Sequence, residues 1–185
     1  MGKKLTFFKE AIKSIKTSGT VIPSSRFLVK KILKNIDFST SELIVEYGSG
    51  NGIITKQILK KLNPSAILIC FEINETFLLD LRKIDNKQII VLNASAENVQ
   101  EEIEKLGFNK VDNFISSLPL AILPKELSKV IVENSYTALQ ENGRFVQYQY
   151  STQFLKQFKA IFSKKIVLKF EPLNLPPALI YVCEK

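Results

Sequence analysis

The sequence predicts an α/β fold in which a seven-stranded, mostly parallel sheet carries helices on both faces. From residue 43 onward, short apolar runs typical of buried strands alternate with segments of helical periodicity, as parallel βαβ units require. Two successive strand-like runs with no helix between them follow, as in an antiparallel hairpin. The 185 residues, 45% of them hydrophobic, can bury one sizeable core. We therefore expect a single domain over residues 1–185.

Two helices are expected ahead of the sheet, within residues 1–35. Residues 5–16 place apolar side chains at helical spacing with lysines beside them, which predicts a basic amphipathic helix. That helix either packs on the core or lies at a membrane interface with its lysines toward anionic headgroups. The second helix follows Ser24 and Ser25, whose hydroxyls can cap its first turn.

The remaining elements form a core over residues 36–185. Runs rich in Ile, Leu, Val and Phe predict seven strands, at residues 43–47, 66–71, 88–92, 111–116, 144–150, 166–171 and 178–183. Apolar side chains three and four residues apart predict helices at residues 55–62, 75–82, 96–106, 125–139 and 152–162. We expect Asn142-Gly143 to end the helix of residues 125–139, and Pro176-Pro177 to lie in the turn of the closing hairpin.

Composition excludes several kinds of chemistry. The chain has no histidine, which removes Ser-His-Asp and Cys-His nucleophile systems and His-ligated zinc. Cys70 and Cys183 lie in apolar runs without metal-ligand spacing, so we expect two buried free thiols and no metal site. The net charge of +8 favours an anionic partner: nucleic acid, anionic lipid or a phosphorylated substrate. No apolar stretch approaches the roughly 18 residues that span a bilayer, so a cytoplasmic protein is expected.

A nucleoside-containing cofactor is predicted at the end of the first strand. Gly48, Gly50 and Gly52 follow the strand of residues 43–47 and precede a helix, so the backbone there can approach a ligand closely. Glu72 ends the second strand, where a carboxylate can accept hydrogen bonds from both ribose hydroxyls.

The segment Glu46-Tyr47-Gly48-Ser49-Gly50-Asn51-Gly52 resembles motif I of the class I methyltransferases, which have a Rossmann-like fold. The resemblance implies S-adenosylmethionine as the cofactor and places Glu46 near its methionine ammonium group. Ser95 stands where these enzymes commonly have an Asp that contacts the adenine amine. The cofactor-binding residues expected from this motif and its neighbours are Glu46, Tyr47, Gly48, Ser49, Gly50, Gly52, Glu72, Ile73, Ser95, Ala96 and Ser116.

The fourth strand ends in Phe114-Ile115-Ser116-Ser117-Leu118-Pro119-Leu120, where methyltransferases of this class hold the acceptor. In the ribosomal-RNA adenine dimethyltransferases the corresponding motif resembles Asn-(Leu/Ile)-Pro-(Tyr/Phe), in which the aromatic ring stacks on the base. Ser117 and Leu120 occupy the outer places here, and Leu120 offers no flat π face. The segment is instead similar to the Ser-x-Leu-Pro-Leu of the bacterial phospholipid N-methyltransferases.

Three further stretches resemble that lipid-modifying family: Gly19 to Arg26, Gly143 to Tyr150 and Asn174 to Tyr181. The resemblance implies methyl transfer to the headgroup amine of a phospholipid such as phosphatidylethanolamine. An ornithine-type aminolipid is an open alternative, because it also carries a primary amine beside long acyl chains. An adenine of rRNA or another nucleic acid is a less favoured alternative. A catalytically silent binding module, the third alternative, would have its cleft blocked at residues 117–120.

The expected catalytic residues are Ser117, Leu118, Pro119, Tyr148 and Tyr150. Methyl transfer to an amine depends mainly on alignment, and the proton acceptor is left open among Tyr148, Tyr150, water and the lipid phosphate. Alternation puts both tyrosines on one strand face, where they either pack across strands or hold a partly methylated ammonium by cation–π attraction of about 0.5 to 2 kcal/mol.

Ser25, Arg26 and Tyr148 are the expected substrate-binding residues. Ser25 and Arg26 are candidates for the lipid phosphate, with simple helix capping as the alternative for Ser25. We also expect an anionic membrane surface as a partner, reached through the helix of residues 5–16. That contact would hold the protein peripherally at the inner face of the plasma membrane.

Overall fold

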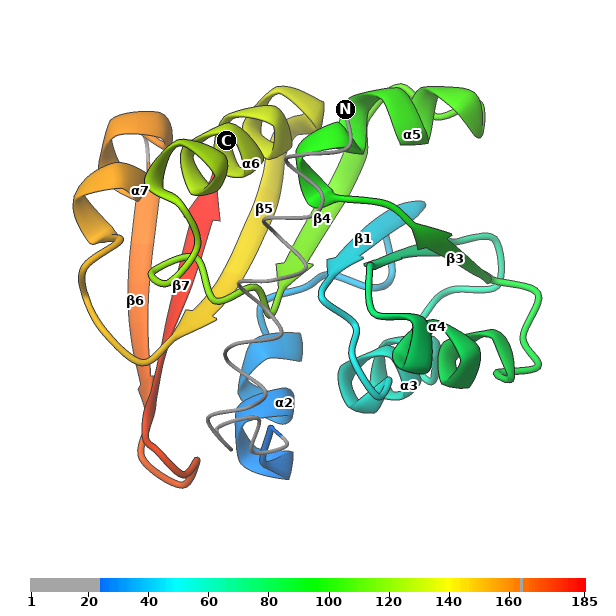
Figure 1. Cartoon of the computed structure of the whole chain (residues 1–185), viewed down its shortest axis with the longest axis horizontal. Coiled ribbons are helices and arrows are strands. Elements are labelled where there is room, and N and C mark those ends of the chain that lie inside the picture. Colours follow the sequence, from blue (N-terminus) through cyan, green and yellow to red (C-terminus); the bar gives the residue numbers. More distant parts are fainter. Residues whose placement is uncertain (1–23, 164) are drawn as a thin grey trace.

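The computed structural model describes residues 24–163 and 165–185 (Figure 1). The amphipathic helix predicted over residues 5–16, and with it the predicted membrane contact, lies outside the described residues, as does most of the stretch from Gly19 to Arg26.

A seven-stranded sheet forms the centre of the molecule, with the strand order β3-β2-β1-β4-β5-β7-β6. Its strands are β1 (Leu43–Tyr47), β2 (Ile67–Glu72), β3 (Ile89–Asn93), β4 (Val111–Ser116), β5 (Leu139–Gln149), β6 (Lys165–Glu171) and β7 (Ala178–Glu184). The first five are parallel, and β7 runs antiparallel to both β5 and β6. The mostly parallel sheet and its closing antiparallel pair are therefore confirmed.

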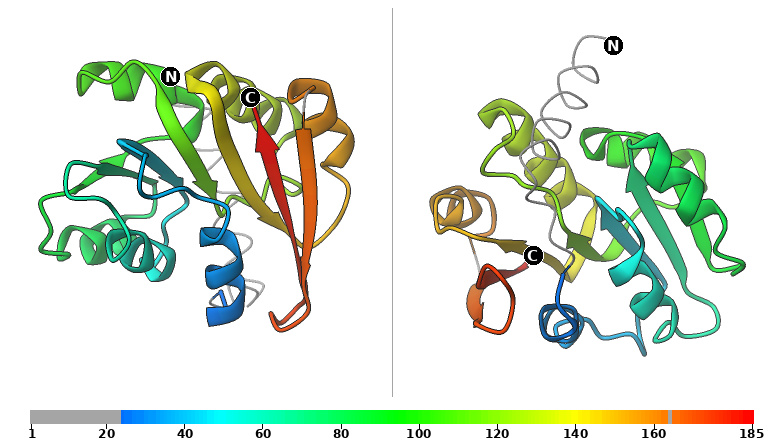
Figure 2. Two further views of the ribbon diagram at one scale, coloured as in Figure 1. Left: turned by 180° about the vertical axis from the view of Figure 1, so that it is seen from behind. Right: turned by 60° about the horizontal axis from the view of Figure 1, so that its bottom comes forward.

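Helices cover both faces of this sheet (Figures 1 and 2). One face carries α2 (Arg26–Leu33), α3 (Ile53–Leu59) and α4 (Glu75–Arg82). The other carries α5 (Val99–Lys105), α6 (Lys125–Ala138) and α7 (Leu155–Ile161). Two buried apolar clusters result, one on each side of the sheet, because alternate residues of each strand point to opposite faces. None of the helices in the described ranges is long and apolar enough to cross a membrane.

Aromatic packing anchors the strand end from which the predicted cofactor loop leaves. Tyr47 is fully buried, and its ring lies 5.4 Å from that of Phe71 and 5.2 Å from that of Phe114, between ring centres. The hydroxyls of Tyr47 and Ser135 of α6 are 3.1 Å apart, within hydrogen-bonding distance. Because the Tyr47 side chain belongs to the core, only its backbone is available to a cofactor.

Two boundaries differ from the sequence prediction. The prediction that Asn142-Gly143 ends a helix is wrong: α6 ends at Ala138, and both residues lie within β5. Asn142 has a positive φ of 62°, and its backbone and that of Gly143 pair with Lys185. A Cβ at Gly143 would come within 2.8 Å of the Asp112 carbonyl oxygen, so close strand packing explains this glycine. The helix predicted over residues 96–106 begins as a 3₁₀ turn, Ala96–Asn98, before α5.

Candidate active site

The glycine loop after β1 adopts a conformation that favours glycine. Gly48, Gly50 and Gly52 have φ values of 67°, 53° and 76°, in the left-handed region where a Cβ is disfavoured. A Cβ on Gly48 would lie 3.2 Å from a methyl carbon of Leu118, in the predicted acceptor segment. The loop that is predicted to bind the cofactor and the segment that is predicted to bind the acceptor are therefore in direct contact.

Glu72, at the end of β2, holds this loop in place. Its Oε2 accepts a hydrogen bond of 2.9 Å from the Gly50 N–H, and its Oε1 accepts bonds of 2.9 and 2.8 Å from the N–H groups of Ile73 and Asn74. A carboxylate has about four acceptor positions, so it can also accept a hydrogen bond from a ligand hydroxyl. The predicted ribose-binding residue thus has a structural role that the sequence did not reveal.

A cavity of about 260 Å³ opens at Leu118, the residue that lies against Gly48 of the glycine loop. Residues from 117–122, after β4, and from 148–153, at the end of β5, line it. All five predicted catalytic residues belong to this lining. The rings of Tyr148 and Tyr150 meet edge to face, with their centres 6.0 Å apart, on the common strand face that alternation predicted.

Two buried glutamines, which sequence reasoning missed, fix the acceptor segment. The side-chain N–H groups of Gln147 and Gln149 each donate a hydrogen bond of 3.0 Å to the Leu118 carbonyl oxygen. Both glutamines are buried in β5. Their signal in the sequence is two amides at alternate positions of a strand, where the inward-facing residues are usually apolar.

The start of α2 lies against this cavity and against the β6–β7 turn. Ser24 donates a hydrogen bond of 3.4 Å from its Oγ to the Tyr148 hydroxyl, and the Ser25 N–H donates one of 3.0 Å to Asn174 Oδ1. The Ser25 Oγ accepts the Leu28 N–H at 3.2 Å, so the capping interpretation is confirmed for this residue. Arg26 is exposed, and its guanidinium lies 4.8 Å from the centre of the Phe27 ring.

The relatives of this chain indicate which reaction the site carries out. No protein-family model matches the chain. It is 29% identical over 166 residues to an ornithine lipid N-methyltransferase of Singulisphaera acidiphila, covering 89% of this chain and 86% of that protein. It is also 29% identical over 143 residues to ribosomal RNA small subunit methyltransferase A of Borreliella burgdorferi, covering 70% of this chain but only 46% of that relative, about half its length.

Solved structures share the fold. An O-methyltransferase from Bacillus cereus superposes with a TM-score of 0.71 at 12% identity, covering 97% of this chain and 91% of the other. An rRNA methylase from Streptococcus thermophilus gives a TM-score of 0.60 at 16% identity, covering 84% and 93%. The fold is that of the class I methyltransferases.

The chain is an S-adenosylmethionine-dependent methyltransferase.

Buried polar groups of this methyltransferase fit such a cofactor. The Ser95 Oγ, just after β3, is buried and has no hydrogen-bond partner among the described residues. An orphaned hydroxyl is costly, and an amine of a bound ligand can satisfy it. Ala96 and Ile73 are buried beside the strand ends, and the Ser116 Oγ accepts the Leu118 N–H at 3.3 Å. Their contact with the cofactor remains a prediction.

Glu46 of the methyltransferase has an environment that the motif alone did not indicate. Its side chain is fully buried, and its Oε2 accepts hydrogen bonds of 2.6 Å from Thr55 Oγ1 of α3 and 3.5 Å from Cys70 Sγ. Burial raises the pKa of Glu46 to about 7, although the hydrogen bonds from Thr55 and Cys70 oppose the rise. The predicted role beside the methionine ammonium group therefore concerns a carboxyl that solvent does not reach.

Proposed function

We propose that this methyltransferase transfers methyl groups to the primary amine of a membrane lipid headgroup. The observation that carries the proposal is the cavity in which the Tyr148 and Tyr150 rings meet beside the acceptor segment. Two aromatic faces attract a partly methylated ammonium, which stays cationic after each transfer. The likeness to an ornithine lipid N-methyltransferase over 89% of the chain supports the same class of acceptor.

The residues of the chain act mainly by alignment. Bound S-adenosylmethionine supplies an activated methyl group on a sulfonium. Contact between Gly48 and Leu118 keeps the donor loop beside the acceptor segment, and the bond of 2.9 Å from the Ser117 N–H to the Tyr47 carbonyl reinforces it. The two glutamines hold the Leu118 carbonyl, so that the Ser117-Leu118-Pro119 backbone is fixed before an amine enters.

We assign the two cavity tyrosines to binding of the lipid ammonium group and not to removal of the amine proton. Burial raises the pKa of Tyr150, the neighbouring Tyr148 raises it further, and the polar side chain of Asn174 lowers it by less. The Tyr150 phenol therefore stays neutral at neutral pH, and its π face is the feature it offers to an ammonium. The amine proton leaves to water or to the lipid phosphate.

The headgroup is that of an ornithine-type aminolipid or of phosphatidylethanolamine. Both carry a primary amine close to two acyl chains, so one cavity with one aromatic pair serves either. The relationship to the Singulisphaera protein favours the ornithine-type lipid, and the acceptor motif resembles that of the phospholipid enzymes.

Leu120 argues against an adenine acceptor. It holds the place of the base-stacking ring of the adenine dimethyltransferases, yet it is buried in the core beneath α6 and does not line the cavity. Its carbonyl accepts a bond of 2.8 Å from Ser128 Oγ, which keeps the residue turned inward. The open cavity at Ser117 to Pro119 likewise argues against a silent binding module.

Labelled S-adenosylmethionine tests the acceptor directly. The protein is incubated with vesicles containing ornithine lipid or phosphatidylethanolamine, and separately with total RNA, and label is counted in each extract. We expect label in lipid, lost in Glu72→Ala and kept in Glu104→Ala, which changes an exposed carboxylate on α5. Label in RNA, or in neither extract, would contradict the proposal.

A further inference from the structure

Large apolar side chains gather at the exposed end of the β6–β7 hairpin. Leu173 and Leu175 are 62% and 74% exposed, and Phe170, at the end of β6, is 53% exposed. We call these three residues the apolar tip. Three exposed prolines, Pro172, Pro176 and Pro177, complete the turn, so polar side chains contribute little to its surface.

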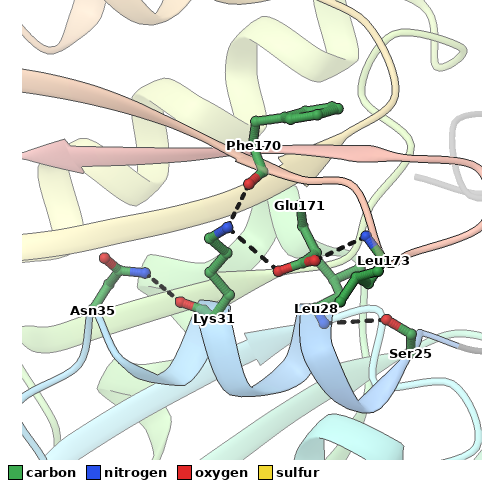
Figure 3. Close-up of polar contacts among 7 residues, drawn as sticks. All are labelled: Ser25, Leu28, Lys31, Asn35, Phe170, Glu171 and Leu173. Carbon is green, nitrogen blue, oxygen red and sulfur yellow. Dashed lines mark hydrogen bonds and ion pairs between the residues drawn. The ribbon is translucent and has the colours of Figure 1, made fainter.

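Polar contacts with α2 tie this turn down (Figure 3). Lys31 of α2 donates a hydrogen bond to the Phe170 carbonyl and lies 3.4 Å from Glu171 Oε2. The other carboxylate oxygen of Glu171 accepts the Leu173 N–H at 2.9 Å. With the bond from Ser25 to Asn174, these contacts hold the tip in a defined place while its apolar side chains stay in solvent. Such exposure of fixed apolar groups marks an interaction site.

The charge around the tip is positive. Residues 24–36 contain four basic residues, Arg26, Lys30, Lys31 and Lys34, and no Asp or Glu. Across β6 and the turn, residues 165–178, the one acidic residue is Glu171, which is buried and paired with Lys31. Apolar side chains with lysines beside them suit an anionic lipid surface, which takes the first into its acyl boundary and attracts the second.

The tip also stands at the mouth of the acceptor cavity. The Asn174 side chain, between Leu173 and Leu175, accepts the Ser25 N–H, and the adjacent Ser24 donates a hydrogen bond to Tyr148, a residue of the cavity lining. Ile122, another lining residue, is itself 62% exposed. In Figure 1 the β6–β7 turn projects past the other strand ends, alongside α2. A surface that receives the tip therefore faces the cavity mouth.

We propose that the apolar tip inserts into the headgroup region of an anionic lipid membrane and holds the cavity mouth there. This inference rests on the proposed lipid acceptor, because a headgroup amine stays at the membrane surface and the enzyme has to reach it. Binding by the tip is nevertheless separate from turnover and is measured without it.

Vesicle binding of the full chain tests the tip. We compare the wild type, Leu173→Ser/Leu175→Ser, and a matched control, Leu79→Ser/Leu106→Ser, which removes two exposed leucines from α4 and the end of α5. With phosphatidylglycerol–phosphatidylcholine vesicles, we expect the tip variant to lose about tenfold or more in affinity, and the control to bind like the wild type. Affinity for S-adenosylmethionine and the melting temperature are expected to match in all three.

A fluorescence experiment locates the inserted residue. The chain has no tryptophan, so Leu173→Trp introduces a single indole fluorophore. We expect its emission to shift to the blue on vesicle addition and to be quenched by lipids brominated on their acyl chains, whereas Leu106→Trp is expected to show neither change. The proposal would be overturned if Leu173→Ser/Leu175→Ser bound vesicles as tightly as the wild type does. It would also be overturned if brominated lipids left the tryptophan of Leu173→Trp unquenched.

A water-soluble, short-chain aminolipid separates failure of the tip from failure of the proposed function. If the tip variant methylates this substrate like the wild type but loses vesicle binding, both inferences stand. If vesicle binding depends on the tip but no aminolipid is methylated, only the proposed function is contradicted. If an aminolipid is methylated but vesicle binding does not depend on the tip, only the inference that the tip inserts into the membrane is contradicted.

Discussion

The two halves of the active site are built in different ways. The donor half, made by the glycine loop, Glu72 and Ser95, lies within β1 to β3 and relies on backbone conformation and buried oxygens. The acceptor half brings together side chains from four distant segments: the start of α2, residues 117–122, residues 148–153 and the β6–β7 turn. The first needs only the neighbouring strands β1 to β3 and the turns that follow them, whereas the second exists only after the whole sheet has formed.

The largest effect that this difference predicts is the loss of every methyl transfer in Glu72→Ala. Three backbone N–H groups, at Gly50, Ile73 and Asn74, lose their acceptor, each at a cost of about 1 to 3 kcal/mol if left unsatisfied. We expect affinity for S-adenosylmethionine, measured by calorimetry, to fall about 100-fold or more. Glu104→Ala serves as the control, and an unchanged affinity in Glu72→Ala would show that the donor loop does not depend on this carboxylate.

A second test of the donor half concerns stability and pH. The native pKa of Glu46, about 7, is above its ordinary 4.5, so the native state binds this proton more tightly than the unfolded state. That stabilisation is complete below pH 4.5 and is lost as pH rises through 7. Between pH 5 and 8 we expect the wild type to lose about 2 to 3 kcal/mol relative to Glu46→Gln, measured by urea unfolding. A difference that stays constant with pH would place the carboxyl in a more polar setting.

In the acceptor half, Tyr148 tests whether an aromatic face binds the ammonium. Tyr148→Ala is expected to raise the KM for the lipid about tenfold, in line with cation–π attraction, and to leave the affinity for S-adenosylmethionine unchanged. Tyr148→Phe keeps the ring and is expected to stay within about twofold to threefold of the wild type. If Tyr148→Phe raises the KM for the lipid as much as Tyr148→Ala does, lipid binding depends on the hydroxyl that contacts Ser24 and not on the ring.

The smallest expected effect belongs to Gln149→Leu. It removes one of the two amides on the Leu118 carbonyl, a change of about 1 kcal/mol, so kcat should fall about fivefold with little change in cofactor affinity. Gln100→Leu, on α5, is the matched control. If the affinity for S-adenosylmethionine changed as much as kcat, the donor and acceptor halves would be coupled through the Leu118 carbonyl.

The same contrast explains what the sequence could predict. The glycine loop and the carboxylate at the end of β2 were predictable because left-handed backbone and strand ends leave local signals at Gly48, Gly50 and Glu72. Asn142-Gly143 carries a local signal too, but β5 continues through it because these residues pair with Lys185, over 40 positions away.

Long-range contacts explain the remaining omissions. The alternation of β5 predicted that Tyr148 and Tyr150 share a face, but nothing in the strand shows that the glutamines beside them meet a carbonyl about 30 residues earlier. The direction of Glu46, toward Thr55 of α3, likewise depends on how a helix packs on the sheet. The apolar tip was hidden for the same reason, since only the fold leaves Leu173 and Leu175 uncovered.

The position of β7 in the sheet has a consequence for the nascent chain. β7 follows the other strands in the sequence, yet it lies between β5 and β6. As the ribosome releases the chain, residues 43–116 can pair as β1 to β4, but β6 has no neighbour until residues 178–184 emerge. Until then β5 and β6 each present an unpaired edge that invites aggregation. The sheet is therefore completed only by its last strand, and the edges of β5 and β6 stay open to misassembly until that strand is free to pair.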